Sequence, residues 1–140
     1  MFLAKTPALQ RLKQAISNKL KGQVAKKIKQ HLLGLDKRRL GIRSDHAALN
    51  TLLQSAGAII MKKATVLAYR YLHAEGFLFG RDWALCAHIH DEMQIEARAE
   101  IAERVGQIVV QAMVDAGLFF NLKLPIAGEY KIGFTWADTH

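Results

Sequence analysis

Apolar residues recur every three or four positions along the first third of the chain. This spacing is typical of one face of a helix, and the residues are Leu9, Leu12, Ile16, Leu20, Val24, Ile28 and Leu32. Thr6 and Pro7 stand where an N-cap and a first-turn proline would begin this helix. Gly22 lies inside the stripe, and glycine costs about 1 kcal/mol in a helix interior. The pattern therefore predicts one helix, or two helices divided near Lys21 and Gly22.

A second helical pattern is longer and more apolar. Ser44 can cap it, the Asp45 carboxylate suits the positive end of the helix dipole, and Gly76 is placed to end it after about Glu75. Its middle, from Leu52 to Met61, is apolar on most faces, which predicts burial on more than one side. Between the two helical patterns, residues 34–41 are typical of a charged connector or a short hairpin.

Two extended runs follow in the second half of the chain. They are residues 83–89 and 93–97, and the three residues between them predict a tight β-hairpin. A helix is expected over residues 99–116 with Gly117 beyond its end. Residues 119–124 and 130–135 are expected to form two short strands or one bent edge. The predicted fold is α+β, with long helices packed on a small antiparallel sheet that contains the hairpin.

Length and composition favour one soluble, intracellular domain. The chain has 140 residues, of which 51% are hydrophobic, and this suffices for a single core. It has no apolar run long enough for a membrane span and no secretory signal, so we expect a cytoplasmic protein with no membrane partner. The single cysteine, Cys86, is expected to be a buried and inert core residue.

Positive charge is concentrated at the front of the chain. Residues 1–43 hold twelve Lys and Arg residues and one acid, Asp36, whereas residues 44–140 hold eight basic and eleven acidic residues. Such a basic segment suits a polyanion such as a nucleic-acid backbone, which Lys and Arg bind by displacing counterions. A solvated helix face with lysines that promote solubility is the alternative.

Titratable residues cluster at the tip of the predicted hairpin, at His90-Asp91-Glu92. Because side-chain alternation relaxes at a turn, Asp91 and Glu92 can approach one point. Two carboxylates there suit Mg²⁺, which takes few protein ligands and completes its shell with water and substrate phosphates. Two-metal phosphoryl chemistry needs further carboxylates from elsewhere. The alternative is an ordinary turn, where aspartate is common because of its local hydrogen bonds.

A file of polar residues marks the second predicted helix. His46, Asn50 and Gln54 recur at four-residue steps and so share one face. Imidazole and amide groups can bond base edges in the minor groove, where the pattern of donors and acceptors is nearly the same for all base pairs. Alternatively, Asn50 and Gln54 satisfy backbone groups inside a core. Arg43 can reach a phosphate or be an ordinary surface arginine.

The segment from Arg43 to Ala58, followed by His90-Asp91-Glu92, resembles the family A DNA polymerases. Within that family it is similar to the replicative enzymes of short-tailed phages. The segment Phe2 to Leu9, the turn at residues 34–36 and the tail from Trp136 to His140 look like the same branch. The resemblance therefore spans essentially the whole chain.

This resemblance implies roles for the hairpin. His90-Asp91-Glu92 would be the palm hairpin known as motif C. Asp91 is similar to the aspartate that holds the catalytic metals, and Glu92 looks like its less essential neighbour. His90 resembles a histidine near the primer terminus.

Roles for the rest of the chain are also implied by the resemblance. Asn50 and Gln54 match helix residues that contact DNA near the insertion site, whereas His46 stands where many relatives have arginine. Residues 1–43 would be basic fingers-side helices with a connector. Residues 44–140 would be the C-terminal palm part, and the chain as a whole would be one structural unit of a larger polymerase.

The resemblance further implies that essential parts lie upstream in the family, namely the metal-binding aspartate of motif A and the nucleotide-binding helix of motif B. We therefore expect the C-terminal subunit of a split phage DNA polymerase, or a fragment of one, that acts in the host cytoplasm only together with an upstream polypeptide. Its partners would be primer–template DNA and deoxynucleoside triphosphates. Mg²⁺ would occupy a two-metal site shared with that polypeptide.

Two other functions remain as alternatives. One is a non-catalytic DNA-binding or scaffold remnant of a polymerase, which would keep the basic helices and the polar file. The other is a metal-dependent nuclease built on His88, Asp91 and Glu92, which is disfavoured because it has too few carboxylates.

Overall fold

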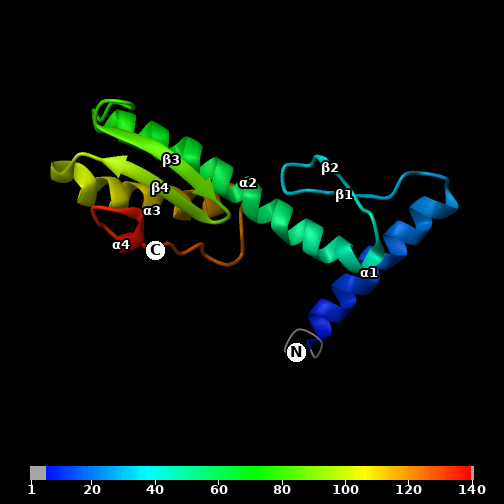
Figure 1. The fold of residues 1–140 in the computed structure, drawn as a ribbon. Helices are drawn as coiled ribbons and strands as arrows, with labels where there is room; N and C mark the ends of the chain where they lie inside the picture. The colour runs from blue at the N-terminus through cyan, green and yellow to red at the C-terminus, as the bar shows by residue number, and fades with distance from the viewer. Residues whose placement is uncertain (1–5, 140) are drawn as a thin grey trace. The chain divides into compact units, whose positions relative to one another are not determined.

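A computed structural model describes residues 6–139, which form four α-helices, one 3₁₀ helix and two β-hairpins (Figure 1). Their order is α1 (Pro7–Ala25), β1 (His31–Leu33), β2 (Arg39–Gly41), α2 (Asp45–Ala74), β3 (Trp83–Ile89), β4 (Glu92–Ala97), the 3₁₀ helix η2 (Ala99–Ile101), α3 (Ala102–Phe119) and α4 (Trp136–Thr139). Two compact units are present, one ending at Ala56 and the other beginning at Gly57. Helix α2 contributes residues to both. The α+β class predicted from the sequence is confirmed.

Helix α1 begins where the sequence predicts but ends earlier. Thr6 is extended and Pro7 lies in the first turn, although the Thr6 side chain makes no capping hydrogen bond. The helix passes through Gly22 without a break and ends at Ala25. Lys27 then adopts a left-handed backbone with φ 56°, which turns the chain out of the helix before Leu32 is reached. The expectation that the helix includes Leu32 is therefore wrong.

Leu32 reaches the core from a strand instead. It lies opposite Leu40 in the antiparallel β1–β2 hairpin. Of the two structures expected over residues 34–41, a charged connector or a short hairpin, the hairpin is the one found. The side-chain amide of Gln23 on α1 accepts a hydrogen bond from the His31 backbone N–H at 2.8 Å and donates one to the His31 carbonyl at 3.0 Å. Gln23 thus satisfies both backbone groups of the first β1 residue, which ties the hairpin to α1.

The start of α2 closes the core of the first unit. The Ser44 hydroxyl accepts a hydrogen bond from the Ala47 N–H at 3.4 Å, as an N-cap does, and the Ser17 hydroxyl of α1 donates to the Asp45 carboxylate at 3.3 Å. The buried core of this unit consists of Ile16, Leu20, Leu32, Ile42 and Ala48. At the other end of α2, Gly76 has φ 86° and ends the helix as predicted.

In the second unit, the later part of α2 and helix α3 pack on one face of the β3–β4 hairpin (Figure 1). The antiparallel pairing sets Trp83 opposite Ala97 and Ile89 opposite Glu92, which confirms the predicted hairpin and leaves a turn one residue shorter than expected. The buried core comprises Ala68, Leu72, Trp83, Val105, Ile108, Val109 and Ala112.

Large apolar side chains of α2 remain accessible within the described part of the chain. Leu53 is 60% exposed, and Val66 and Tyr69 are each 46% exposed. Within the predicted stretch from Leu52 to Met61, however, Ile59 and Met61 are both buried. Two helical positions separate them, so they lie on different sides of α2, and the predicted burial on more than one side is confirmed there although Leu53 is exposed. None of the described helices combines the length and the apolar character that a membrane span requires.

Cys86 is exposed, so the prediction of a buried core cysteine is wrong. The strand register shifts between Leu85 and Ala87, and Cys86 is the extra residue in β3 at this bulge. A bulge breaks the alternation of side chains between the two faces of a sheet. The apolar sequence around Cys86 gave no sign of this irregularity.

The end of the chain differs most from the prediction. Helix α3 runs past Ala116 to Phe119, and within the described residues the expected strands over 119–124 and 130–135 are absent. Gly117 is not the stop residue. A Cβ atom there would lie 2.6 Å from Cγ1 of Ile126, and one at Gly106 would lie 2.4 Å from the ring of Tyr130. These glycines let the irregular tail pack closely against α3, which replaces strand pairing.

Candidate functional site

Asp91 lies in the turn at the tip of the β3–β4 hairpin. Because Ile89 and Glu92 pair across the strands, only His90 and Asp91 reverse the chain. His90 has φ 54°, a left-handed conformation that few non-glycine residues adopt. The Asp91 side chain is exposed, and within residues 6–139 no hydrogen bond or ion pair joins it to another side chain. Its carboxylate oxygens are therefore available to a cation.

Glu92 is held differently from its neighbour. Its carboxylate accepts a hydrogen bond from the side-chain amide of Gln94, which lies two residues further along β4 and so on the same face of the strand. Glu92 is half-buried, whereas Asp91 is exposed. The two adjacent carboxylates are thus unequal, and Asp91 is the more accessible of the two.

The hairpin tip has the donor chemistry of one side of a magnesium site. Mg²⁺ is commonly bound through one or two carboxylates, with water and substrate phosphates as its other ligands. Within residues 6–139, no group of three or more His, Cys, Asp or Glu side chains is arranged to hold a metal ion. The remaining protein oxygens of a two-metal site would have to come from elsewhere.

Behind the tip, a hydroxyl group on α2 contacts the hairpin. The Thr65 Oγ1 atom lies 3.0 Å from the Met61 carbonyl oxygen, 3.4 Å from Nδ1 of His88 and 3.4 Å from the sulfur of Met93. His88 and Met93 are opposite each other across the two strands. No feature of the sequence marks Thr65 as a functional residue, because a single threonine in an apolar helix forms no distinctive pattern.

A buried carboxylate holds the base of the hairpin. Asp82 is 5% exposed and accepts hydrogen bonds from the Leu78 backbone N–H at 2.8 Å and from Nη2 of Arg81 at 2.7 Å. The Arg98 guanidinium lies 3.6 Å away. The Arg81 and Leu78 hydrogen bonds, with the charges of both arginines, outweigh burial and lower the pKa of Asp82 to about 2. Asp82 therefore remains ionised and fixes the loop from which β3 starts.

The predicted polar file lies in the first unit. His46, Asn50 and Gln54 are all exposed, whereas Ala48 on the same helix is buried in the core. The alternative that Asn50 and Gln54 satisfy backbone groups inside a core is therefore wrong. Arg43, just before α2, is also exposed. These side chains have free access to a ligand such as duplex DNA.

Basic side chains of the first unit face solvent. Every Lys and Arg from Arg11 to Arg43 is exposed, and Lys5 lies outside the described residues. Asp36 binds Arg38. Burial would raise the pKa of Asp36, but the hydrogen bonds and charge of Arg38 lower it below its ordinary value. Among the described residues of this unit, no second basic side chain forms an ion pair, so the positive charge is available to an anion.

The predicted site residues fall into two sets. Arg43, His46, Asn50 and Gln54 belong to the first unit, and His90, Asp91 and Glu92 to the second. The first set offers charge and neutral hydrogen-bonding groups, which suit nucleic acid. The second set offers an accessible carboxylate, which suits a divalent cation.

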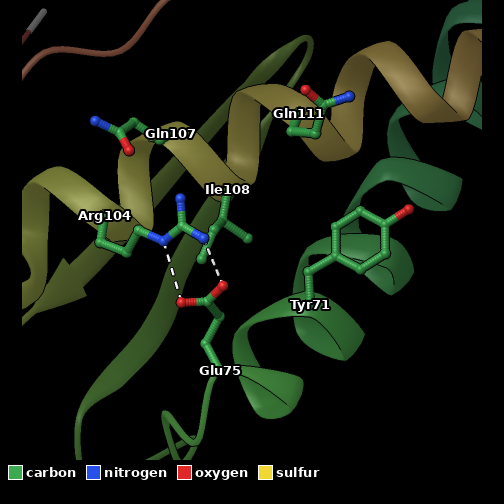
Figure 2. A pocket seen from close by; sticks show the side chains of 6 residues that line it. All are labelled: Tyr71, Glu75, Arg104, Gln107, Ile108 and Gln111. Atoms are coloured by element: carbon green, nitrogen blue, oxygen red, sulfur yellow. Dashed lines mark hydrogen bonds and ion pairs between the residues drawn. The ribbon is translucent and has the colours of Figure 1, made fainter.

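A hollow of about 300 Å³ between α2 and α3 contains none of these residues (Figure 2). It is lined by Tyr71, Glu75, Arg104, Gln107, Ile108 and Gln111. Arg104 donates two hydrogen bonds to Glu75, which lower the pKa of Glu75 against the opposing effect of burial. Tyr71 donates to Asp115 at 2.9 Å. The polar groups of the hollow are thus largely satisfied by the protein itself.

The sequence of the whole chain is similar to those of known proteins. The sequence profile of DNA polymerase family A matches residues 5–138. The chain is 38% identical to the DNA-directed DNA polymerases of Enterobacteria phage T3 and Escherichia phage T7, with 99% of the chain and 21% of each relative covered. It is 30% identical to DNA polymerase I of Bacillus caldotenax, with 79% of the chain and 12% of the relative covered. The chain thus spans about a fifth of the length of the phage relatives.

Proposed function

The chain belongs to DNA polymerase family A, and we propose that it is the C-terminal part of a DNA-directed DNA polymerase of phage replication that acts in the host cytoplasm. In this proposal the β3–β4 hairpin contributes Asp91 to a magnesium site, and the first unit binds primer–template DNA. The substrates are deoxynucleoside triphosphates. The similarity to phage DNA-directed DNA polymerases supports the reaction class.

One observation carries this proposal. Asp91 is an accessible carboxylate, without a side-chain partner in the described residues, at the tip of a hairpin that is packed on two helices. An aspartate with a structural role in a turn usually accepts local hydrogen bonds, and the Asp91 carboxylate accepts none within residues 6–139. A carboxylate on a supported hairpin can instead place a cation at a fixed point.

DNA binding is supported by the surface of the first unit. Exposed lysines and arginines can neutralise backbone phosphates without regard to sequence. The exposed file of His46, Asn50 and Gln54 can bond minor-groove edges, which are similar in all base pairs. Arg43 adds a guanidinium at the start of the file, where it can bind a phosphate. His90, beside Asp91, is proposed to lie near the primer terminus.

Further polymerase protein is needed to complete the site. The described residues hold no cluster of three metal-binding side chains, and α2 exposes Leu53, Val66 and Tyr69. Exposed apolar side chains that lie together commonly mark a protein interface, and Val66 and Tyr69 are neighbours three residues apart on α2. We propose that protein carrying motifs A and B covers these side chains and supplies the other metal-binding carboxylate. An upstream polypeptide is the expected source, and the preceding part of one longer chain is the alternative.

In the complete enzyme, bound Mg²⁺ would activate the primer 3′-hydroxyl and stabilise the pyrophosphate leaving group. Asp91 would position the ion, and Glu92 would contribute less because Gln94 already engages its carboxylate. The exposed polar groups of the first unit would hold the duplex in register for the reaction. Reactants held in the correct geometry react faster, because the entropy cost of bringing them together is already met on binding.

Primer extension tests the proposal. The chain is mixed with a polypeptide carrying motifs A and B, and DNA synthesis is measured for the wild type, Asp91→Asn and Glu96→Gln. Glu96 is a matched control because it is an exposed carboxylate on β4. We expect synthesis in the mixture only, a loss of at least about 10- to 100-fold in Asp91→Asn, the range for residues that merely support metal ligands, and little change in Glu96→Gln. Undiminished synthesis in Asp91→Asn would contradict the metal role.

The basic surface also favours a second candidate, a non-catalytic DNA-binding remnant. In that case the chain binds duplex DNA but no mixture restores synthesis, and Asp91→Asn changes nothing measurable. Co-purification with an upstream gene product separates a two-polypeptide enzyme from a single longer chain.

A further inference from the structure

The contact between Thr65 and the hairpin lies just behind the turn that carries Asp91. Going inward from the turn, the first cross-strand pair is Ile89 with Glu92 and the second is His88 with Met93. Both residues of the second pair lie 3.4 Å from the Thr65 hydroxyl oxygen, at Nδ1 of His88 and at the sulfur of Met93. One hydroxyl group of α2 thus contacts both strands at the end nearest to Asp91.

The β-bulge brings His88 to this position. Leu85 and Ile95 pair on the face that packs against the core, and a regular strand would send residue 88 to the opposite face. The extra residue Cys86 reverses the alternation, so that His88 shares the face of Leu85 and meets Thr65. The irregularity that exposes Cys86 therefore also creates the Thr65–His88 contact.

Hydrogen-bond geometry assigns the direction of this contact. Thr65 has a single hydroxyl hydrogen, and its shortest acceptor is the Met61 carbonyl at 3.0 Å. When that hydrogen is donated to Met61, the contact with His88 requires Nδ1–H of the imidazole to donate to Thr65. This fixes the tautomer of His88 and leaves Nε2 as an acceptor.

We propose that Thr65 is a positioning residue for Asp91, which it serves by holding the His88–Met93 pair, and with it the hairpin turn, at a fixed place on α2. This proposal rests on the proposed metal role of Asp91. A two-stranded hairpin is marginally stable alone, and a metal ligand must be held to within about 0.5 Å. The base of the hairpin is fixed by Asp82 and the buried Trp83, whereas Thr65 contacts it near the tip.

Metal dependence of synthesis provides the first test, in the mixture of the chain with a polypeptide carrying motifs A and B. Thr65→Val removes the hydroxyl with little change of shape, Thr65→Ser keeps it, and Thr51→Val is the matched change elsewhere on α2. We expect Thr65→Val to raise the Mg²⁺ concentration for half-maximal rate about tenfold, with a rate at saturating Mg²⁺ near that of the wild type. Thr65→Ser and Thr51→Val should match the wild type.

The histidine tautomer provides a second test that needs no activity. Long-range ¹H–¹⁵N spectra of the full chain at about pH 8, where histidine is ordinarily neutral, distinguish Nδ1–H from Nε2–H. We expect His88 to carry its proton on Nδ1 in the wild type and Thr65→Ser, and to lose this preference in Thr65→Val. The exposed His73 should be unchanged in all three proteins.

The outcomes separate this proposal from the proposed function. If Asp91→Asn abolishes synthesis but Thr65→Val leaves the Mg²⁺ dependence and the His88 tautomer unchanged, the positioning role is wrong and the metal role stands. A shifted Mg²⁺ dependence that Thr65→Ser does not restore also overturns it. If synthesis survives Asp91→Asn, both proposals fail.

Discussion

The two units of the chain differ in their balance of charge and in how their basic side chains are paired. The unit that ends at Ala56 contains twelve basic and two acidic residues, whereas residues 57–140 contain eight basic and ten acidic residues. In the first unit the described basic side chains are exposed and mostly without carboxylate partners. In the second unit Arg81, Arg98 and Arg104 pair with carboxylates. The first unit thus leaves most of its positive charge unpaired, as the proposed binding of DNA requires, whereas the second unit uses several of its charges in ion pairs within its own fold.

Helix α2 belongs to both units, and its character changes along its length. Its first part carries the exposed polar file, and its later part carries Ala68 and Leu72 in the core together with Thr65 behind the hairpin. A single continuous element thus bears groups proposed for DNA contact and groups that support the proposed metal ligand. We infer that the first unit serves mainly to bind DNA and that the second unit serves mainly the metal-dependent reaction.

The largest expected effect tests whether the two cores are independent. Leu20 and Leu72 are both fully buried, one in each unit. Leu20→Ala and Leu72→Ala should each lower the free energy of unfolding by about 2–5 kcal/mol. Hydrogen exchange should show lost protection mainly in the unit that carries the change. Equal loss of protection across both units in both variants would show that the chain unfolds as one.

The next effect tests the assignment of DNA binding to the first unit. A first triple variant removes three exposed charges of α1 through Lys13→Gln, Lys19→Gln and Lys21→Gln. A matched triple variant removes three exposed charges of the second unit through Arg70→Gln, Lys123→Gln and Lys131→Gln. The α1 triple should weaken duplex binding roughly tenfold and reduce the salt slope by about 0.9 for each lost phosphate contact. The matched triple should change neither. Equal effects would remove the contrast between the units.

A smaller effect concerns how the stability of the second unit depends on pH. The folded pKa of Asp82 is about 2, below its ordinary value of 3.8, so its stabilising contribution is complete above that ordinary value. It is lost as the pH falls from about 4 towards 2. The midpoint of thermal unfolding of the wild type should therefore fall more steeply over this range than that of Asp82→Asn, which should be lower at neutral pH. Parallel curves would show that Asp82 does not stabilise the second unit in this way.

The smallest effect compares two helical glycines. Nothing lies within 4 Å of a Cβ atom built on Gly22 of α1, whereas one on Gly106 of α3 would lie 2.4 Å from the Tyr130 ring. Gly22→Ala should stabilise the first unit by up to about 1 kcal/mol. Gly106→Ala should give no such gain and should increase hydrogen exchange in the tail near Tyr130. A similar gain in both variants would show that the tail does not depend on close packing.

The sequence predicted the regular elements better than the irregular ones. Local signals such as Pro7, Ser44 and Gly76 marked helix ends correctly, and the spacing around Asp91 predicted the hairpin. The tail was predicted as strands because its apolar residues suit strands, but it packs through Ile126 and Tyr130 on glycines of α3. Such a contact joins residues distant in sequence and leaves no periodic pattern.

The candidate site, too, was predictable from the sequence only where it follows a regular pattern. The polar file and the acidic tip were visible as patterns of residue type, and the match to DNA polymerase family A supports the family resemblance. The bulge at Cys86 and the contact of His88 with Thr65 depend on one unpaired residue in β3. Register shifts of this kind arise from packing, so the sequence alone did not reveal them.

Binding of Mn²⁺, a paramagnetic substitute for Mg²⁺, tests the central claim most directly. Electron paramagnetic resonance would follow its titration into the chain alone, and into the chain with primer–template DNA, a nucleoside triphosphate and the polypeptide carrying motifs A and B. We predict no tight site in the chain alone. Beyond the Mn²⁺ that the DNA and the nucleoside triphosphate bind without protein, we predict tight binding in the assembly that is lost in Asp91→Asn. Tight binding by the isolated chain, or an assembly that binds equally well in Asp91→Asn, would contradict the account.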